Sequence, residues 1–396
     1  MNNKSIFLGT EEIYVGLIGM IALQDAMNAS ELLKPIFDII KYPLLGMIIA
    51  TMLYLAFKVK YKAAAWGCFI ILFVLGLNTA KILSTNVVLY IAILCFLSDG
   101  KNLKKVARAV LWIIGGIFVL HMLMFLVNYS FSRSSLSYLE WNGLQRYNMY
   151  FDHPNNAAKY FVFICVLIEY AYADKIKLKQ WFCLMISMGI IYYFTHSEAV
   201  FVTIILFVMS YGKNTLYGKN IIEFVARYGM AINAIISASC AMLITIPVIS
   251  KLLLLLDGMG SGRFSNLFYA VQKYGLTLFG QKALFGSYQI VGGYNGIYAD
   301  NFTVYCMTCM GICYIVIVCI LFYFGAKKMD LAGKEYLCMF IVFSLFENRV
   351  LGIEAYFALI VAANSCLCRT KEIIGGGQKS YNTLLTYIGG SPSLAY

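Results

Sequence analysis

Two arginines in long polar segments are the residues of this sequence best suited to chemistry on an anionic substrate. Arg146 lies in a segment that spans 129–156, and Arg263 lies in a second segment, 249–300, directly after Gly262. A guanidinium group stays charged, and its planar fork matches phosphate oxygens two at a time. Two such groups on separate segments indicate a diphosphate site, although either arginine could instead serve only to pack its own loop.

Carboxyl, imidazole and amide side chains precede the apolar runs that follow these segments. The run Asp152-His153-Pro154-Asn155-Asn156 comes before one of them, and Asp300-Asn301 comes before another. His153 could bind phosphate or move a proton, and Asn155 and Asn301 are predicted to bind substrate. Asp300 could act as the general base on a hydroxyl group. Both acidic positions could equally be helix caps, since Asp is favoured just before a first helical turn.

Further polar groups could complete such a site. Gly262 permits close backbone approach to an anion. Arg349 lies in a tight turn with Glu347, and this turn is a third candidate for the site or a local ion pair. Asp25 and Glu198 interrupt apolar runs, where internal pairing is the alternative to function.

The composition predicts an all-α polytopic membrane protein. The 396 residues are 61% hydrophobic and only 13% charged, and the mean hydropathy is +0.76. A bilayer core is crossed by about 20 apolar helical residues, and an isolated span must satisfy its own backbone, which favours helices. We expect a single integral membrane domain over 1–396 with about twelve transmembrane helices. The expected spans are 13–30, 42–57, 64–84, 86–98, 109–128, 157–173, 181–195, 197–211, 229–248, 301–325, 335–346 and 351–367.

The distribution of lysine and arginine predicts the orientation of these spans. Most of the 31 basic residues fall in the short loops after the even-numbered spans, and basic loops stay in the cytoplasm. Both termini are therefore expected in the cytoplasm, with the tail 368–396. The segments 129–156 and 249–300 then form two larger external loops of a multi-pass protein of the cell membrane.

Two further helices are expected beside the spans. Residues 221–227 should form a short interfacial helix before the ninth span, and 263–273 should form an amphipathic helix on the membrane surface. We find no internal repeat of the kind that marks transporters built from paired halves, which argues against a transporter.

Several chemistries lack support in the sequence. Cys306, Cys309 and Cys313 would share one helix face, but no histidine is near, so buried thiols are favoured over a metal site. No Asp-x-Asp and no phosphate-binding Gly-Lys loop occurs. The net charge is +12, and most of the excess basic residues lie in the short loops between spans. This distribution is explained by the orientation of the spans, so the charge does not indicate binding to nucleic acid. We expect neither a metal nor another cofactor.

At three places the sequence resembles the bacterial O-antigen and capsular polysaccharide polymerases of the Wzy type, which are related to O-antigen ligases. These places are Arg146 with Phe151-Asp152-His153-Pro154-Asn155, Ser261-Gly262-Arg263 with a later Leu278-Phe279-Gly280 or Leu284-Phe285-Gly286, and Asp300-Asn301 with Gly311. The resemblance covers roughly 140–355. One departure is Ser197-Glu198, where the family often has Ser-Arg, so a phosphate role at that position is not carried over.

The resemblance implies a metal-independent, inverting membrane glycosyltransferase with a GT-C-like fold. Its substrates would be oligosaccharides linked to undecaprenyl diphosphate, and a chain-length regulator and a flippase would be possible partners. Arg263 and Arg146 would stabilise the departing diphosphate, and Asp300 would be the base. Related ligases tend to carry histidine where Asp300 stands, which favours a polymerase.

Other functions stay open at this point. A ligase would transfer a finished glycan to an outer acceptor, and a flippase would need its arginines along a central cavity within the spans. A purely structural membrane scaffold would leave the order of the motifs unexplained.

Overall fold

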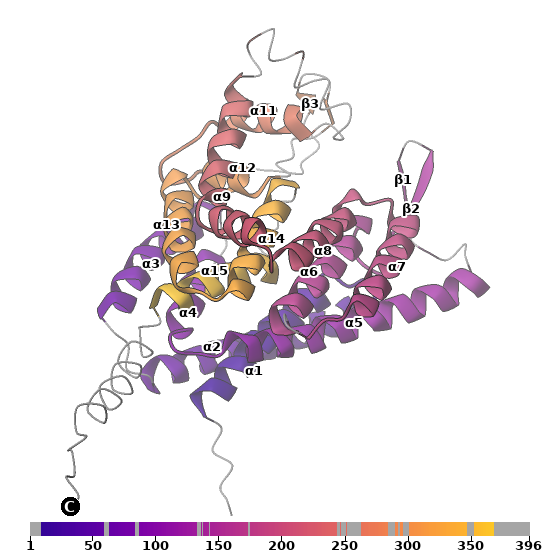
Figure 1. Ribbon diagram of the computed structural model, residues 1–396, viewed down its shortest axis with the longest axis horizontal. Helices are drawn as coiled ribbons and strands as arrows, with labels where there is room; N and C mark the ends of the chain where they lie inside the picture. Colours follow the sequence, from indigo (N-terminus) through magenta and orange to yellow (C-terminus); the bar gives the residue numbers. More distant parts are fainter. Residues whose placement is uncertain are drawn as a thin grey trace, which may run out of the picture.

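The computed structural model is all-α apart from short β-hairpins at one end of a helical bundle (Figure 1). The described residues are 9–58, 63–83, 87–132, 136, 138–141, 143–172, 175–243, 246, 251, 263–283, 290–291, 294–295, 301–346 and 352–367.

The first part of the chain consists of helices that correspond one to one to the first five expected spans. These helices are α1 (Thr10–Asn28), α2 (Lys34–Lys58), α3 (Ala63–Leu83), α4 (Val87–Leu97) and α5 (Leu103–Phe131). Helices α3 and α4 pack against each other, and α1 packs against both α2 and α5.

The rest of the chain begins with a hairpin that connects α5 to α6. In order, its elements are β1 (Tyr138–Trp141), β2 (Leu144–Tyr147), α6 (Pro154–Tyr172), α7 (Leu178–Thr195), the 3-10 turn η2 (Glu198–Phe201), α8 (Val202–Gly212), α9 (Leu216–Leu243), α11 (Arg263–Tyr274), β3 (Ile290–Val291), β4 (Tyr294–Asn295), α12 (Phe302–Cys309), α13 (Ile312–Lys328), α14 (Leu331–Phe346) and α15 (Ile353–Leu367). The sheets are antiparallel pairs, β1 with β2 and β3 with β4.

The helices carry the apolar outer surface that a bilayer requires. Among the described residues, three helices are long and apolar enough to cross a membrane, namely Lys34–Lys58, Leu103–Phe131 and Leu216–Ser239 within α9, and several shorter apolar helices accompany them. Large apolar side chains on the outside are open to the surroundings: Phe57 is 87% exposed, Trp112 76% and Phe131 84%. Such faces are unfavourable in water and compatible with lipid.

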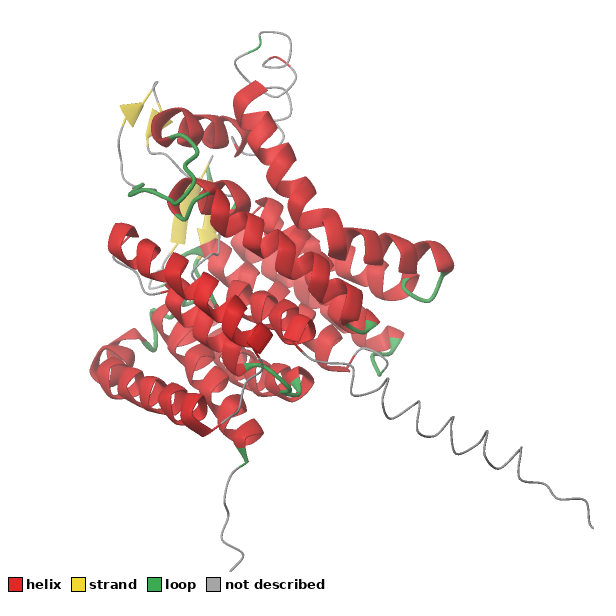
Figure 2. Cartoon of the chain, turned by 90° about the vertical axis from the view of Figure 1, so that its left-hand side faces the viewer, coloured by secondary structure: helices red, strands yellow, loops and turns green. Residues whose placement is uncertain are grey.

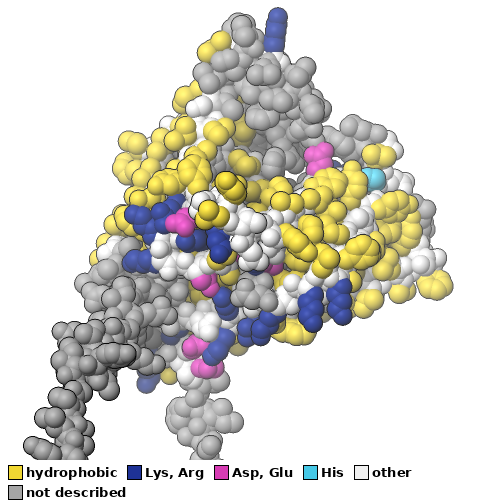
Figure 3. All heavy atoms as spheres, viewed as in Figure 1, with side chains coloured by type: hydrophobic (Ala, Val, Ile, Leu, Met, Phe, Trp, Pro, Cys, Tyr) yellow, Lys and Arg dark blue, Asp and Glu magenta, His cyan; other side chains and the backbone are white. Residues whose placement is uncertain are grey.

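On the face that Figure 3 shows, most of the visible lysine and arginine side chains lie along the lower margin, below a broad hydrophobic band, and one lies at the upper tip. The hairpins lie at the end opposite this margin (Figure 1). Ion pairs join helix ends at the basic margin, with Lys104 Nζ 2.7 Å from Asp330 Oδ2 and Lys334 Nζ 3.2 Å from Glu223 Oε2. The strands lie at the upper end in two views at right angles (Figures 1 and 2). The segment 138–147 is thus remote from the basic margin.

A buried ion triad joins three helices of the second half. Lys213 Nζ, just after α8, lies 2.6 Å from Glu169 of α6 and 3.3 Å from Glu335 of α14. The three side chains are at most 7% exposed, and Ser210 also donates to Glu169 at 2.9 Å. Charges this deeply buried are tolerated only when they are paired, so the triad fixes how α6, α8 and α14 sit together.

The apolar run expected as one span from 301 to 325 is divided into α12 and α13. The break lies at Gly311, whose φ is 94°, a backbone conformation that side chains disfavour. Beyond it, the amide of Ile312 donates to the carbonyl of Thr277 at 2.8 Å, and the next amide donates to Leu278 at 3.0 Å. The preceding loop therefore satisfies the first N–H groups of α13, which a helix cannot satisfy itself.

Two glycines allow this loop to reach the break. A Cβ on Gly280 would lie 2.4 Å from the carbonyl oxygen of Cys309, and a Cβ on Gly311 would lie 2.4 Å from that of Leu278. Gly280 also has a positive φ, 90°. Gly280 and Gly311, which the sequence assigned to separate motifs, therefore form one backbone contact.

Helix α9 is continuous where a separate interfacial helix was expected at 221–227. Ile222, Ala226 and Met230 are all buried, and their four-residue spacing extends one packed face across the expected boundary. The helix expected at 263–273 is confirmed as α11, which packs on α9 and α12. Its expected place on the membrane surface stays a prediction.

The glycine contact generates a first prediction. Gly311→Ala should lower the free energy of unfolding by about 2 kcal/mol or more, since it adds left-handed strain of about 1–2 kcal/mol and a backbone overlap. The measurement is the apparent melting temperature of the purified protein in detergent. Gly189→Ala, in open space on α7, is the matched control and should leave the melting temperature unchanged or raised; equal melting of the two variants would contradict the contact.

The ion triad generates a second prediction. Lys213→Met removes the cation that the two buried carboxylates share and should destabilise the protein by about 3–5 kcal/mol. The triple variant Lys213→Met, Glu169→Leu, Glu335→Leu removes all three charges and should recover most of that loss. Thermal unfolding of both variants in detergent checks this, and a triple variant no more stable than Lys213→Met would show that the charges are not the cause.

Candidate functional site: an arginine fork beside a helix N-terminus

Arg146 is held from two sides by protein acceptors. It lies on β2 opposite Leu139 of β1. Its Nε donates to the carbonyl of Thr195 at 2.9 Å, and Nη2 donates to Oδ1 of Asn155 at 2.5 Å. Thr195 is the last residue of α7, so the guanidinium also caps a helix end whose carbonyls lack partners and carry negative partial charge.

The remaining donors of Arg146 are available to a ligand. A guanidinium has five N–H donors, and the two contacts above use two of them; the rest find no partner among the described residues. Burial lowers the pKa of Arg146 from its ordinary value, and the carboxylate of Glu198 raises it. The group remains a cation, because an arginine keeps its proton in proteins.

The N-terminus of α6 adjoins this fork. Pro154 is the first helical residue, and the amide of Asn155 donates to Nδ1 of His153 at 3.1 Å. His153 therefore caps the helix, the role that the sequence gave to Asp152. Because Nδ1 accepts, the neutral ring carries its proton on Nε2. Asp152 is exposed and its carboxylate accepts from Asn156.

A turn at the end of α1 anchors the segment between β2 and α6. Met149 and Tyr150 have φ of 52° and 63°, conformations uncommon for side-chain-bearing residues. They turn the chain so that the amide of Asp152 donates to Ala29 at 3.1 Å and the carbonyl of Tyr150 accepts from Glu31 at 2.8 Å.

A buried aromatic side chain, Phe151, also anchors this segment. Phe151 is 1% exposed and stacks on the ring of Tyr160, with 5.3 Å between the ring centroids. It also makes a T-shaped contact with the ring of His121, with 4.5 Å between the centroids. Ser30 lies 2.8 Å from His121 Nε2. The Phe151-to-Asn155 motif thus combines one buried anchor with polar groups aimed at the surface.

Asn301 lies in a different part of the same end. It is 2% exposed, caps α12 through the amide of Val304 at 3.1 Å, and donates to Ser237 at 3.0 Å and to the carbonyl of Leu345 at 3.2 Å. Every polar atom of its side chain is engaged within the protein. The structure therefore shows a capping and positioning role for Asn301, and the predicted contact with substrate stays a prediction.

Several predicted site residues cannot be placed. Gly262, Asp300 and Arg349 lie outside the described residues, and for Arg263 the structure describes only the backbone at the start of α11. Of the predicted set, the structure joins Arg146, Asn155 and His153, and among the described residues no hydrogen bond links these three to Asn301.

Two groups near Arg146 were not predicted there from the sequence. The carbonyl of Thr195 carries no sequence signal. Glu198 is exposed and lies close enough for its charge to act on Arg146. The sequence offered Glu198 as a functional or an internally paired carboxylate, without placing it beside Arg146.

No protein-family model matches the chain, and no match was found among the curated proteins or the solved structures compared with it.

The arrangement suits an anion with several oxygens. A fixed guanidinium fork and a helix N-terminus both attract negative charge, and Glu198 opposes it. We therefore predict that Glu198→Gln strengthens binding of inorganic pyrophosphate about two- to fivefold, the range of an exposed charge pair. Isothermal titration calorimetry on the detergent-solubilised protein checks this. Glu223→Gln, a carboxylate on α9 at the basic end, should not alter binding; equal effects of both variants would indicate bulk charge alone.

Proposed function

We propose that this chain is a polysaccharide polymerase that joins oligosaccharide repeat units carried on undecaprenyl diphosphate. It works at the outer face of the cytoplasmic membrane and builds capsule, O-antigen or exopolysaccharide chains. The proposal includes the finer architecture: about twelve transmembrane helices in a GT-C-like arrangement, with both termini in the cytoplasm.

The fork of Arg146 is the observation that carries the proposal. Its two contacts, to Thr195 and Asn155, fix the guanidinium plane while its other donors face no protein acceptor among the described residues. A leaving group that develops charge on several phosphate oxygens is stabilised by donors that are already in place. The position of the hairpin opposite the basic margin supports chemistry at the outer face (Figures 1 and 3).

The reaction is a displacement at the anomeric carbon of the donor. A hydroxyl oxygen of the acceptor repeat forms the new bond to that carbon, and the carbon–oxygen bond to the diphosphate breaks with inversion. The diphosphate leaves with the electron pair, stabilised by Arg146 and Arg263. The hydroxyl proton passes to Asp300, the proposed base. No metal ion or other cofactor takes part in this proposal.

The proposed roles of Arg146 and Arg263 can be tested in cells. In a host from which the gene is deleted, a plasmid copy should restore a ladder of glycan lengths. Arg146→Lys and Arg263→Ala should each lower chain extension by about 10²–10³-fold, the usual effect of removing a transition-state donor, with membrane abundance of the protein unchanged. The control is Arg108→Lys at the basic end, where Arg108 donates to the carbonyl of Ala171, and it should restore a normal ladder.

The lipid-linked glycans of the deletion host separate the alternatives. Single repeat units that accumulate on the outer leaflet support a polymerase. Long chains trapped on the lipid would indicate a ligase instead, and single repeats confined to the cytoplasmic leaflet would indicate a flippase. Normal extension by both arginine variants would remove them from the site.

A further inference from the structure

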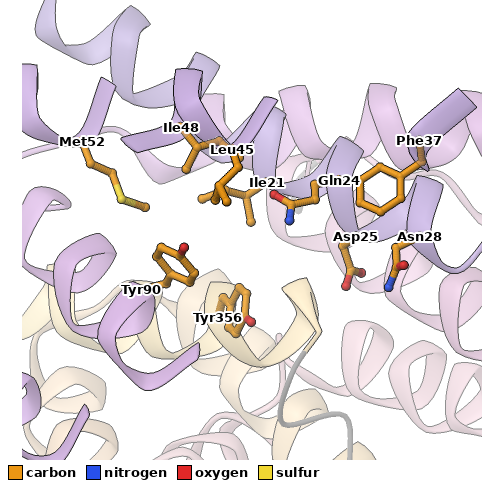
Figure 4. Close-up of a pocket in the computed structure, with 10 residues that line it drawn as sticks. All are labelled: Ile21, Gln24, Asp25, Asn28, Phe37, Leu45, Ile48, Met52, Tyr90 and Tyr356. Atoms are coloured by element: carbon orange, nitrogen blue, oxygen red, sulfur yellow. The ribbon is translucent and has the colours of Figure 1, made fainter. Parts of the chain in front are cut away.

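A cavity of about 310 Å³ lies between α1, α2, α4 and α15 (Figure 4). Polar side chains line one part of it: Gln24, Asp25 and Asn28 of α1, Tyr90 of α4 and Tyr356 of α15. Asn28 lies four positions after Gln24 and three after Asp25, so it neighbours both of them on the surface of α1. This volume falls at the low end of the range for small-molecule sites.

The opposite wall of the cavity is aliphatic. Leu45, Ile48 and Met52 of α2 line it, and Ile48 and Met52 are 2% and 5% exposed. The outer side of α2 is open, with Met47 57% exposed and Leu53 54%. The cavity thus places hydrogen-bonding groups beside an apolar wall on a helix that has a lipid-compatible outer face.

The cavity adjoins the anion site described above. Asp25 accepts a hydrogen bond of 2.8 Å from Tyr160 of α6, and α6 begins at that site. Asn28 ends α1, and the next residue, Ala29, holds the amide of Asp152. The two sites are therefore connected through α6 and through the turn that follows α1.

The side chains that line the cavity favour one class of ligand over others. Among the described residues that line the cavity, Asp25 is the only charged one and none is a lysine or arginine. A phosphate there would meet repulsion without a partner. An ammonium ion could pair with Asp25 but would leave the donors of Gln24 and Asn28 unused. Hydroxyl groups both donate and accept, as amides and phenols do, and a tyrosine ring offers an apolar face to a sugar.

We propose that this cavity is a binding site for the phosphate-free, hydroxyl-rich sugar head of an amphipathic glycolipid, with its aliphatic part along α2. Polyol recognition here is distinct from anion binding at Arg146. It also stands apart from the proposed polymerisation, because it concerns binding at another site.

The test uses the full chain purified into lipid nanodiscs and soluble probes with one alkyl chain. Octyl glucoside, below its micelle-forming concentration, should bind at least about tenfold more tightly than octanol, octyl phosphate or octyltrimethylammonium, as measured by competition in saturation-transfer NMR. Asp25→Asn should weaken glucoside binding about tenfold or more, the value of a hydrogen bond to a charged acceptor. Gln24→Leu should weaken it about two- to tenfold.

The matched control is Asp38→Asn, which removes an exposed carboxylate of α2 that pairs with Lys41 and should leave binding unchanged. Tighter binding of the phosphate or ammonium probe, equal binding of octanol, or unchanged binding in both cavity variants would each overturn the proposal. If Asp25→Asn loses its fold, judged by thermal unfolding, Gln24→Leu decides. Failure here leaves the glycan ladder unaffected, and loss of the ladder leaves probe binding unaffected, so the two proposals fail separately.

Discussion

An unpaired backbone group is costly away from water, and this constraint decides where the chain can leave helical geometry. At several irregular segments a second segment supplies the missing partner. The loop before the break at Gly311 accepts from the first amides of α13, and the turn after α1 accepts from the amide of Asp152. The guanidinium of Arg146 meets the carbonyl of Thr195. These segments at the upper end can be non-helical because their polar groups find hydrogen-bond partners on a neighbouring segment.

This constraint also explains why Arg146 is well placed for function. One of its two protein contacts satisfies a helix end and the other holds Asn155, so the same bonds that stabilise the fold orient the fork. A side chain with rigid supports loses little freedom on binding a ligand. The carboxylate of Glu198 partly offsets the charge of Arg146, at the cost of competing with an anionic ligand.

The sequence predicted the helices well because long apolar runs have few alternatives to a spanning helix. It failed at two boundaries for physical reasons. The break at Gly311 depends on a loop more than thirty positions earlier, and the continuity of α9 depends on the packed face of Ile222, Ala226 and Met230. At the site, the residue types indicated an anion. The pairing of Arg146 with Asn155 and Thr195 brings together β2, α6 and α7, and the sequence alone does not show that these elements are neighbours. For the cavity at Asp25, the only sign in the sequence was that this carboxylate interrupts an apolar run.

The contact between Gly280 and Gly311 also bears on how the protein is made. The loop that holds the carbonyls for α13 precedes that helix in the chain, and synthesis proceeds from the N-terminus. When α13 leaves the ribosome, its backbone partners already exist and need only remain nearby. The carbonyls of Thr277 and Leu278 can therefore accept from the first amides of α13 as soon as that helix forms, without a stage in which those amides lack partners.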